Sequence, residues 1–123
     1  MSHIVTIQTE IRDLPALRAA CCRLQVAAPV YQKNARLFRK QVTGYCIQLP
    51  DWLYPVVCDI DRGQVHYDNF GGRWGKQKEF DRLLQGYAVE KTILEARRQG
   101  YSVSEQPLQD GSIKLQVVVG GSV

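Results

Sequence analysis

The amino-acid sequence predicts an α+β fold, a two-layer sandwich in which two helices cover a mainly antiparallel sheet. Three observations support this prediction. Segments that alternate apolar and polar residues, as half-buried strands do, occur near both ends of the chain and in its middle. Two other segments repeat apolar residues every three or four positions, as amphipathic helices do. Short turns rich in Asp and Gly separate neighbouring strand-like segments and favour hairpins.

The first half of the chain is expected to form a strand, a helix and a longer strand. Residues 4–11 alternate β-branched and polar side chains, which indicates a strand. Asp13 occupies the N-cap position of a helix expected over about residues 14–25. The segment 35–49 is strand-like, but its apolar residues occupy both parities. A bulge or bend near Gly44 would reconcile them.

The second half is expected to contain a hairpin, a long helix and a second hairpin. The expected elements are strands over 55–60 and 64–67, a helix over about 76–99, and strands over 101–105 and 112–119. Gly100 is the natural stop of the helix. The predicted order is therefore βαβββαββ. Residues 1–119 are expected to form one domain, and residues 120–123 a flexible tail.

Composition and cysteine spacing favour a reducing, aqueous compartment. Residues 1–6 lack the basic segment and apolar stretch of a secretory signal. The four cysteines form no CxxC pair, so we predict no zinc site and expect them to be small buried hydrophobes. They are Cys21, Cys22, Cys46 and Cys58. We therefore expect a cytoplasmic protein without a membrane partner.

Acidic and glycine-rich motifs do not predict an enzyme, and we predict no catalytic, cofactor or metal residues. Asp59 and Asp61 share one parity, and Asp68 joins them across the hairpin in a weak candidate for Mg²⁺ binding. His66 and Asp68 form a weak acid–base candidate without a nucleophile. The glycine-rich segment 71–75 lacks the ending of a phosphate-binding P-loop. A flexible connection is the simpler interpretation.

Positive charge and aromatic residues coincide in the middle of the chain. The net charge is +4, yet residues 14–50 carry six cations and no acid. Eight of the eleven aromatic residues fall between positions 31 and 74, namely Tyr31, Phe38, Tyr45, Trp52, Tyr54, Tyr67, Phe70 and Trp74. This combination is typical of protein interfaces and of surfaces that bind single-stranded nucleic acid.

The middle third is therefore predicted to present an outward docking surface for a protein partner. The predicted partner-binding residues are Arg36, Arg39, Lys40, Trp52 and Trp74. A protein is favoured because no ribonucleoprotein-type signature is present and Tyr and Trp suit protein interfaces. The alternative is single-stranded nucleic-acid binding by the same basic aromatic patch. Both interpretations require the rings and cations to form one contiguous exposed surface.

The two ends of the chain carry a family resemblance. The start MSHI with the element TEIRDL at 9–14, LQGYAVEK at 84–91, and the closing QGYSV and DGSIKL occur in this order. They resemble the domain of unknown function numbered 1257, a family that includes the hypothetical chloroplast reading frame thirty-five of algal plastids and cyanobacteria. The resemblance does not extend over the middle of the chain, residues 27–74.

The resemblance implies an accessory or adaptor role and no established activity. Members often occur beside a small companion protein, and some beside a ferredoxin-like protein or an AAA+ ATPase. An uncharacterised, non-enzymatic protein of a multi-protein system, in the cytoplasm or in the plastid stroma, is the function that it implies.

Overall fold

The main sheet buries side chains on both of its faces. One core includes Val56 and Cys58, and a second, smaller cluster includes Val57, which lies between them in the chain. The computed structural model describes residues 5–119, so the tail predicted at 120–123 lies outside the described residues. The elements are β1 (Val5–Gln8), α1 (Leu14–Arg23), β2 (Val30–Leu37), β3 (Lys40–Ile47), β4 (Val56–Asp59), β5 (Gln64–Tyr67), the 3-10 turn η1 (Phe70–Gly72), α2 (Gln77–Arg98), β6 (Ser102–Pro107) and β7 (Ile113–Val118).

The strands form two antiparallel sheets. Five of them pair in the order β1-β5-β4-β3-β2, and β6 and β7 form a separate two-stranded sheet. The predicted α+β class, with two helices and mainly antiparallel strands, is confirmed. No helix within residues 5–119 is long and apolar enough to cross a membrane.

The strand expected over 35–49 forms part of a hairpin. The chain reverses at residues 38–39 between β2 and β3, with Phe38 at a φ of +49°. This reversal accounts for the change of parity that we assigned to a bend at Gly44. A β-bulge does occur, but at Asn34 in β2. Gly44 instead permits close strand approach, because a Cβ there would stand 2.6 Å from the Cys58 carbonyl oxygen.

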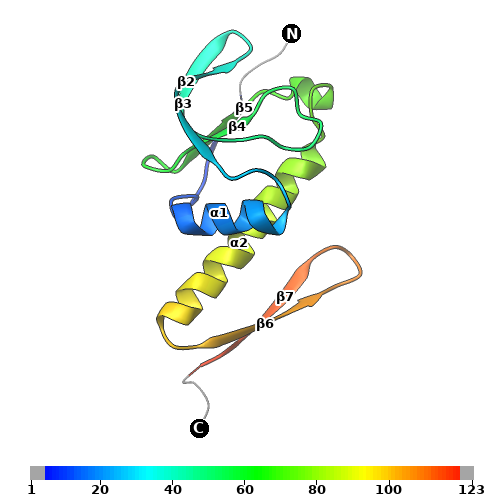
Figure 1. Ribbon diagram of the computed structural model, residues 1–123. Coiled ribbons are helices and arrows are strands. Elements are labelled where there is room, and N and C mark those ends of the chain that lie inside the picture. The colour runs from blue at the N-terminus through cyan, green and yellow to red at the C-terminus, as the bar shows by residue number, and fades with distance from the viewer. Residues whose placement is uncertain (1–4, 120–123) are drawn as a thin grey trace.

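Both helices pack on one face of the main sheet. Alternate positions on β3, β4 and β5 contribute side chains to a single core with α1 and α2. Figure 1 shows the two helices beside the main sheet. Its fully buried members include Leu17, Cys21, Ile47, Val56, Cys58, Val65, Phe80 and Leu83. Burying each large aliphatic or aromatic side chain contributes about 1.5–3 kcal/mol, so this core is the main source of stability.

Small residues and one tyrosine hydroxyl bring the two helices together. A Cβ on Gly86 in α2 would lie 3.6 Å from the Cβ of Ala20 in α1, an ordinary contact distance. The Tyr87 hydroxyl accepts hydrogen bonds from the Arg12 and Asp13 amides at 3.2 and 3.1 Å and donates to the Glu10 carbonyl at 3.2 Å. The α1–α2 contact therefore also fixes the segment that leads into α1.

Asp13 caps α1, as the sequence predicts. Its Oδ1 accepts a hydrogen bond from the Ala16 amide at 3.1 Å, and its Oδ2 lies 2.9 Å from Lys91 Nζ of α2. The hydrogen bond from Lys91 holds the pKa of the Asp13 carboxyl below its ordinary value. The helix ends at Arg23, two residues before the predicted boundary.

An ion-pair clamp ties the β6–β7 hairpin to the helices. Arg23 at the end of α1 donates to both carboxylate oxygens of Glu105 on β6, each at 2.8 Å, and to Glu90 on α2 at 3.3 Å. The side-chain amide of Gln85 donates to the Gly111 carbonyl at 2.9 Å. The predicted C-terminal hairpin therefore forms, but it leans on α2 rather than extending the main sheet.

Two glycines give a matched test of packing. We expect Gly75→Ala to destabilise the protein by about 1–3 kcal/mol, because the new methyl group would overlap the Trp52 ring, with Cγ and Cε2 at 2.6 Å. Gly86→Ala adds helix propensity and meets only ordinary contacts, so it should stabilise the protein by up to ~1 kcal/mol. The free energies of unfolding of the native protein and the two variants, measured in urea, test both effects. Equal stability of the two variants would contradict the assigned packing.

The Arg23 clamp should respond to acid. The hydrogen bond from Arg23 lowers the pKa of Glu105 below its ordinary value of 4.5. The stabilisation is therefore complete above pH 4.5 and is lost as the pH falls below it. At neutral pH, Glu105→Gln should reduce the hydrogen-exchange protection of β6 and β7 about fivefold, equivalent to ~1 kcal/mol for a partly exposed pair. The same protection in both proteins at neutral pH would rule out the clamp.

Candidate functional site

Three predicted partner-binding residues lie together at the end of the β2–β3 hairpin. This hairpin projects from the main sheet, away from the C-terminal strands (Figure 1). Arg36, Arg39 and Lys40 are all exposed there. Together with Phe38 and Gln41 they line an open hollow of about 600 Å³. The hairpin turn thus presents together three cations that lie within five positions of the sequence.

Aromatic rings from three segments meet at Trp74, beneath this turn. The Trp74 ring lies 5.3 Å from that of Phe38, 4.7 Å from Phe70 and 5.7 Å from Tyr54, between ring centroids. The rings are tilted or edge-on, which are favourable aromatic arrangements. We call this surface the cationic aromatic tip and define it by the residues Arg36, Phe38, Arg39, Lys40, Phe70, Arg73 and Trp74.

Guanidinium groups lie over the phenylalanine rings of the tip. Arg39 Cζ is 5.3 Å from the centroid of Phe38, and Arg73 Cζ is 5.3 Å from the centroid of Phe70. Arg36 Nε donates to the Phe38 carbonyl oxygen at 3.3 Å. These contacts restrain three cationic groups against the aromatic cluster, so the positive charge is held in place before any partner binds.

Both phenylalanines of the tip have strained backbones. Phe38 has a φ of +49° and Phe70 a φ of +48°, a region that large side chains rarely adopt. Each such residue costs on the order of 1–3 kcal/mol, which surrounding structure must offset. The same two residues carry the rings under the guanidinium groups. The chain thus tolerates strain at the points where it presents these rings.

The loop that carries Phe70 and Trp74 is held by internal hydrogen bonds. The buried Asp68 carboxylate accepts the Phe70 amide at 3.1 Å. The buried Asn69 side chain donates to the Gly75 carbonyl at 3.1 Å, and the Asn69 backbone carbonyl accepts a hydrogen bond from the Trp74 amide at 2.9 Å. The loop is therefore an ordered platform, unlike the flexible connection that we expected. Its amides serve the loop itself and form no phosphate cradle.

Trp52 is a correction to the predicted surface. Only 4% of it is exposed, and its ring packs against Tyr67 at 5.6 Å and Phe80 at 6.5 Å in the helix-side core. Its indole N–H donates to the Lys76 carbonyl at 3.1 Å. Trp52 therefore cannot touch a partner at the tip. Its role is to support the chain at Gly75, next to Trp74.

Sequence reasoning missed Arg73 and the grouping of Phe38 with Phe70. Arg73 directly precedes Trp74, so the only signal was adjacency to a predicted site residue. Phe38 and Phe70 were among the clustered aromatics, but 32 positions separate them in the chain. Their shared contact with Trp74 depends on tertiary structure.

The three aspartates proposed for Mg²⁺ do not gather. The β4–β5 register pairs Asp59 with Gln64, which places Asp68 at the opposite end of the hairpin, about 13 Å along the strand. Burial raises the pKa of Asp59, but hydrogen bonds from Arg62, 2.8 Å away, outweigh it and lower the pKa overall. Across residues 5–119 no three His, Cys, Asp or Glu side chains are grouped to hold a metal ion.

His66 and Asp68 bind different partners. His66 Nδ1 hydrogen-bonds to the Thr6 hydroxyl at 2.9 Å, whereas Asp68 accepts the Phe70 amide. Burial lowers the pKa of His66. These contacts give both residues structural roles and do not form the acid–base pair considered from the sequence.

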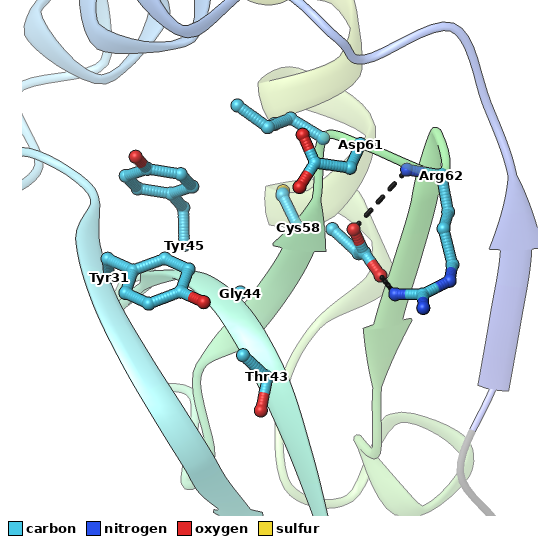
Figure 2. Close-up of a pocket in the computed structure, with 9 residues that line it drawn as sticks. Tyr31, Thr43, Gly44, Tyr45, Cys58, Asp61 and Arg62 are labelled. Atoms are coloured by element: carbon cyan, nitrogen blue, oxygen red, sulfur yellow. Dashed lines mark hydrogen bonds and ion pairs between the residues drawn. The ribbon is translucent and has the colours of Figure 1, made fainter.

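A small pocket lies between β3 and the β4–β5 turn (Figure 2). Figure 2 shows Tyr31 and Tyr45 on one side and Asp61 and Arg62 on the other. The two rings are 5.2 Å apart and edge-on, and the cavity measures about 170 Å³. The Asp59 carboxylate pairs with Arg62 at 2.8 Å, whereas Arg12 donates only to the backbone carbonyl oxygen of Asp61. The lining thus holds two carboxylates and one guanidinium group, and it is too small and too open to identify a ligand.

No protein-family model, no curated protein and no solved structure matches this chain. The resemblance to the domain of unknown function numbered 1257 therefore stays a prediction. Its residues nonetheless have a clear place in the structure. Asp13, Gly86, Tyr87 and Lys91 all belong to the resembling stretches, and all build the α1–α2 junction. The cationic aromatic tip lies in the part of the chain that the resemblance does not cover.

Three of the four cysteines are buried, as expected, and the fourth is exposed. Burial raises the pKa of Cys21 to about 11 and that of Cys58 to about 12, and it also raises the pKa of Cys46. Because the thiolate is the reactive form, these thiols should be inert in the folded protein. Cys22 is exposed on α1.

Thiol labelling tests this burial. Iodoacetamide at mildly alkaline pH should add one adduct per native chain, at Cys22, and four adducts in denaturant. Cys22→Ala should remove the native adduct and leave three in denaturant. Intact mass spectrometry measures the counts. Rapid native labelling of Cys58 would contradict the packing of β4 under the helices.

Proposed function

We propose that this chain is a non-catalytic accessory protein that docks an acidic face of a protein partner through its cationic aromatic tip. The observation that carries the proposal is the grouping of Arg36, Arg39 and Arg73 around two phenylalanine rings that pack on Trp74. Arginine and aromatic residues are enriched among the side chains that contribute most to protein binding.

The fixed geometry of the tip favours binding. A flexible arginine loses rotamer freedom when it binds, at a cost of about 0.5–1.5 kcal/mol per side chain. Arg39 and Arg73 already rest on ring faces, and Arg36 is already hydrogen-bonded to the turn. Part of this cost is therefore met by folding. Carboxylates of a partner are suitable acceptors because guanidinium groups bind them in bidentate pairs.

Ring coverage favours a protein over single-stranded nucleic acid. Bases bind such proteins by stacking on open aromatic faces. In the tip, guanidinium groups cover Phe38 and Phe70, and neighbouring rings surround Trp74. A base would have to displace these contacts, whereas a carboxylate binds to the guanidinium groups as they stand.

The partner that we propose belongs to a multi-protein system. The family resemblance implies a small companion protein or an AAA+ ATPase, and a place in the cytoplasm or the plastid stroma.

Crosslinking through Lys40 tests the proposal. Carbodiimide joins carboxylates to amines, so in a lysate of the native host it should link Lys40 to acidic residues of one recurrent protein. The variant Arg36→Gln, Arg39→Gln, Lys40→Gln should weaken binding of that purified protein at least about tenfold. A matched variant with Arg18→Gln, Lys78→Gln and Arg97→Gln removes the same charge from exposed sites elsewhere and should bind normally.

Two outcomes would overturn the proposal. One is equal loss of binding in both triple variants, which would show that net charge alone is responsible. The other is tight, strongly salt-dependent binding of a fluorescent oligothymidylate that the tip variant abolishes and the matched variant keeps. That second result would assign the tip to nucleic acid.

A further inference from the structure

The β6–β7 hairpin leaves one strand edge open. Within residues 5–119, β7 pairs only with β6, so its outer edge presents backbone N–H and C=O groups without a strand partner. A two-stranded sheet is marginally stable by itself in water. Here the hairpin packs against α2 and is held by the Arg23 clamp, while the outer edge of β7 pairs with no strand.

The other strand edges carry protective features that β7 lacks. β1 is only four residues long, and the β2 edge is interrupted by the bulge at Asn34 and carries Lys33. β6 ends in Pro107, and its Glu105 is held by Arg23. β7 has no proline, no bulge and a single charge at Lys114. Short edges, bulges, prolines and charges are the devices that prevent strand pairing.

Exposed apolar side chains concentrate on this hairpin. Of the seven large hydrophobic residues that are exposed in the described part of the chain, four belong to it, namely Leu108 (42% exposed), Val117 (38%), Val118 (48%) and Val119 (67%). Pairing of such an edge with another strand is stabilised both by backbone hydrogen bonds and by contacts between apolar side chains.

We propose that β7 pairs antiparallel with β7 of a second copy of this chain, which closes a four-stranded sheet across a two-fold axis. Among the strands of residues 5–119, β7 has the one long edge without these features, so pairing two copies through it leaves no such edge exposed. The occupant is a second copy because an antiparallel pair of identical strands is self-complementary.

One register suits the side chains. Centring the pair on Gln116 places Leu115 opposite the partner subunit's Val117, on the face that also carries Glu105 of β6. It also places Lys114 opposite the partner subunit's Val118, so the two lysines do not face each other. Apolar residues thus meet on one face, and like charges stay apart.

This dimer is independent of the proposed docking function. The β6–β7 hairpin and the β2–β3 hairpin lie at opposite ends of the molecule (Figure 1). Pairing through β7 therefore leaves both cationic aromatic tips free.

Sedimentation of the full chain tests the pairing and its register. The native protein should convert from 14.0 kDa to twice that mass over a concentration series from micromolar to several hundred micromolar. Val118→Lys opposes two lysines in the proposed register and should weaken the dimer at least about tenfold. Adding Lys114→Glu creates two opposite-charge pairs and should restore it. Circular dichroism confirms folding, because Val118 is exposed.

Val30→Lys is the matched control at the other apolar edge. Val30 is 56% exposed at the start of β2, so this variant should dimerise as the native chain does. A native chain that stays monomeric throughout the series would overturn the proposal. So would an unweakened Val118→Lys dimer, a failure of Lys114→Glu to restore it, or a dimer that Val30→Lys disrupts.

Discussion

The contact between α1 and α2 is the constraint on which the rest of the structure depends. Ala20 and Gly86 face each other there, with room even for an added Cβ at 3.6 Å, and the Tyr87 hydroxyl binds three backbone groups in the segment before α1. With the helices fixed to each other, their apolar sides cover one face of the main sheet. The 22 residues of α2 then span about 33 Å. The N-terminal end of α2 follows the loop that carries Phe70 and Trp74, and its C-terminal end leads into the β6–β7 hairpin.

Trp52 connects the cationic aromatic tip to the core and holds the tip loop in place. The chain passes so close to the Trp52 ring at position 75 that only glycine fits, and this fixes the residue after Trp74. Buried hydrogen bonds of Asp68 and Asn69 hold the other side of the same loop. Such support offsets the strain of the positive φ angle at Phe70. A surface held in this way loses little conformational freedom when a partner binds.

Hydrophobic periodicity predicted most helices and strands, whereas the contacts between them could be seen only in the structure. The helix that begins after Asp13 and the long helix before Gly100 follow from spacing and caps, as do the hairpins at Gly63 and Gly111. The turn at Phe38 escaped prediction because it contains neither Gly nor Asn, the residues that favour positive φ.

The candidate site was only partly predictable for the same reason. Charge along the chain located Arg36, Arg39 and Lys40, because neighbours on a short hairpin stay neighbours in space. Tryptophan is apolar with one polar edge, so its sequence neighbourhood does not distinguish core from surface. Trp52 and Trp74 thus looked alike, and burial separated them. The contact of Phe38 with Phe70 and Arg73 through Trp74 is long-range and left no periodic signal.

The two proposals have a joint consequence that follows from where α2 places them. A two-fold dimer through β7 carries one cationic aromatic tip at each far end, so a partner with repeated acidic faces meets two identical sites on one particle. Binding at the second site is then intramolecular, and its strength depends on how rigidly the tips are held apart. Each tip is joined to α2 through Gly75, which lies against Trp52, and α2 is joined to β6 through the Arg23 clamp. In such a dimer the clamp would link dimer geometry to docking strength, although it is formed by neither the tip nor the outer edge of β7.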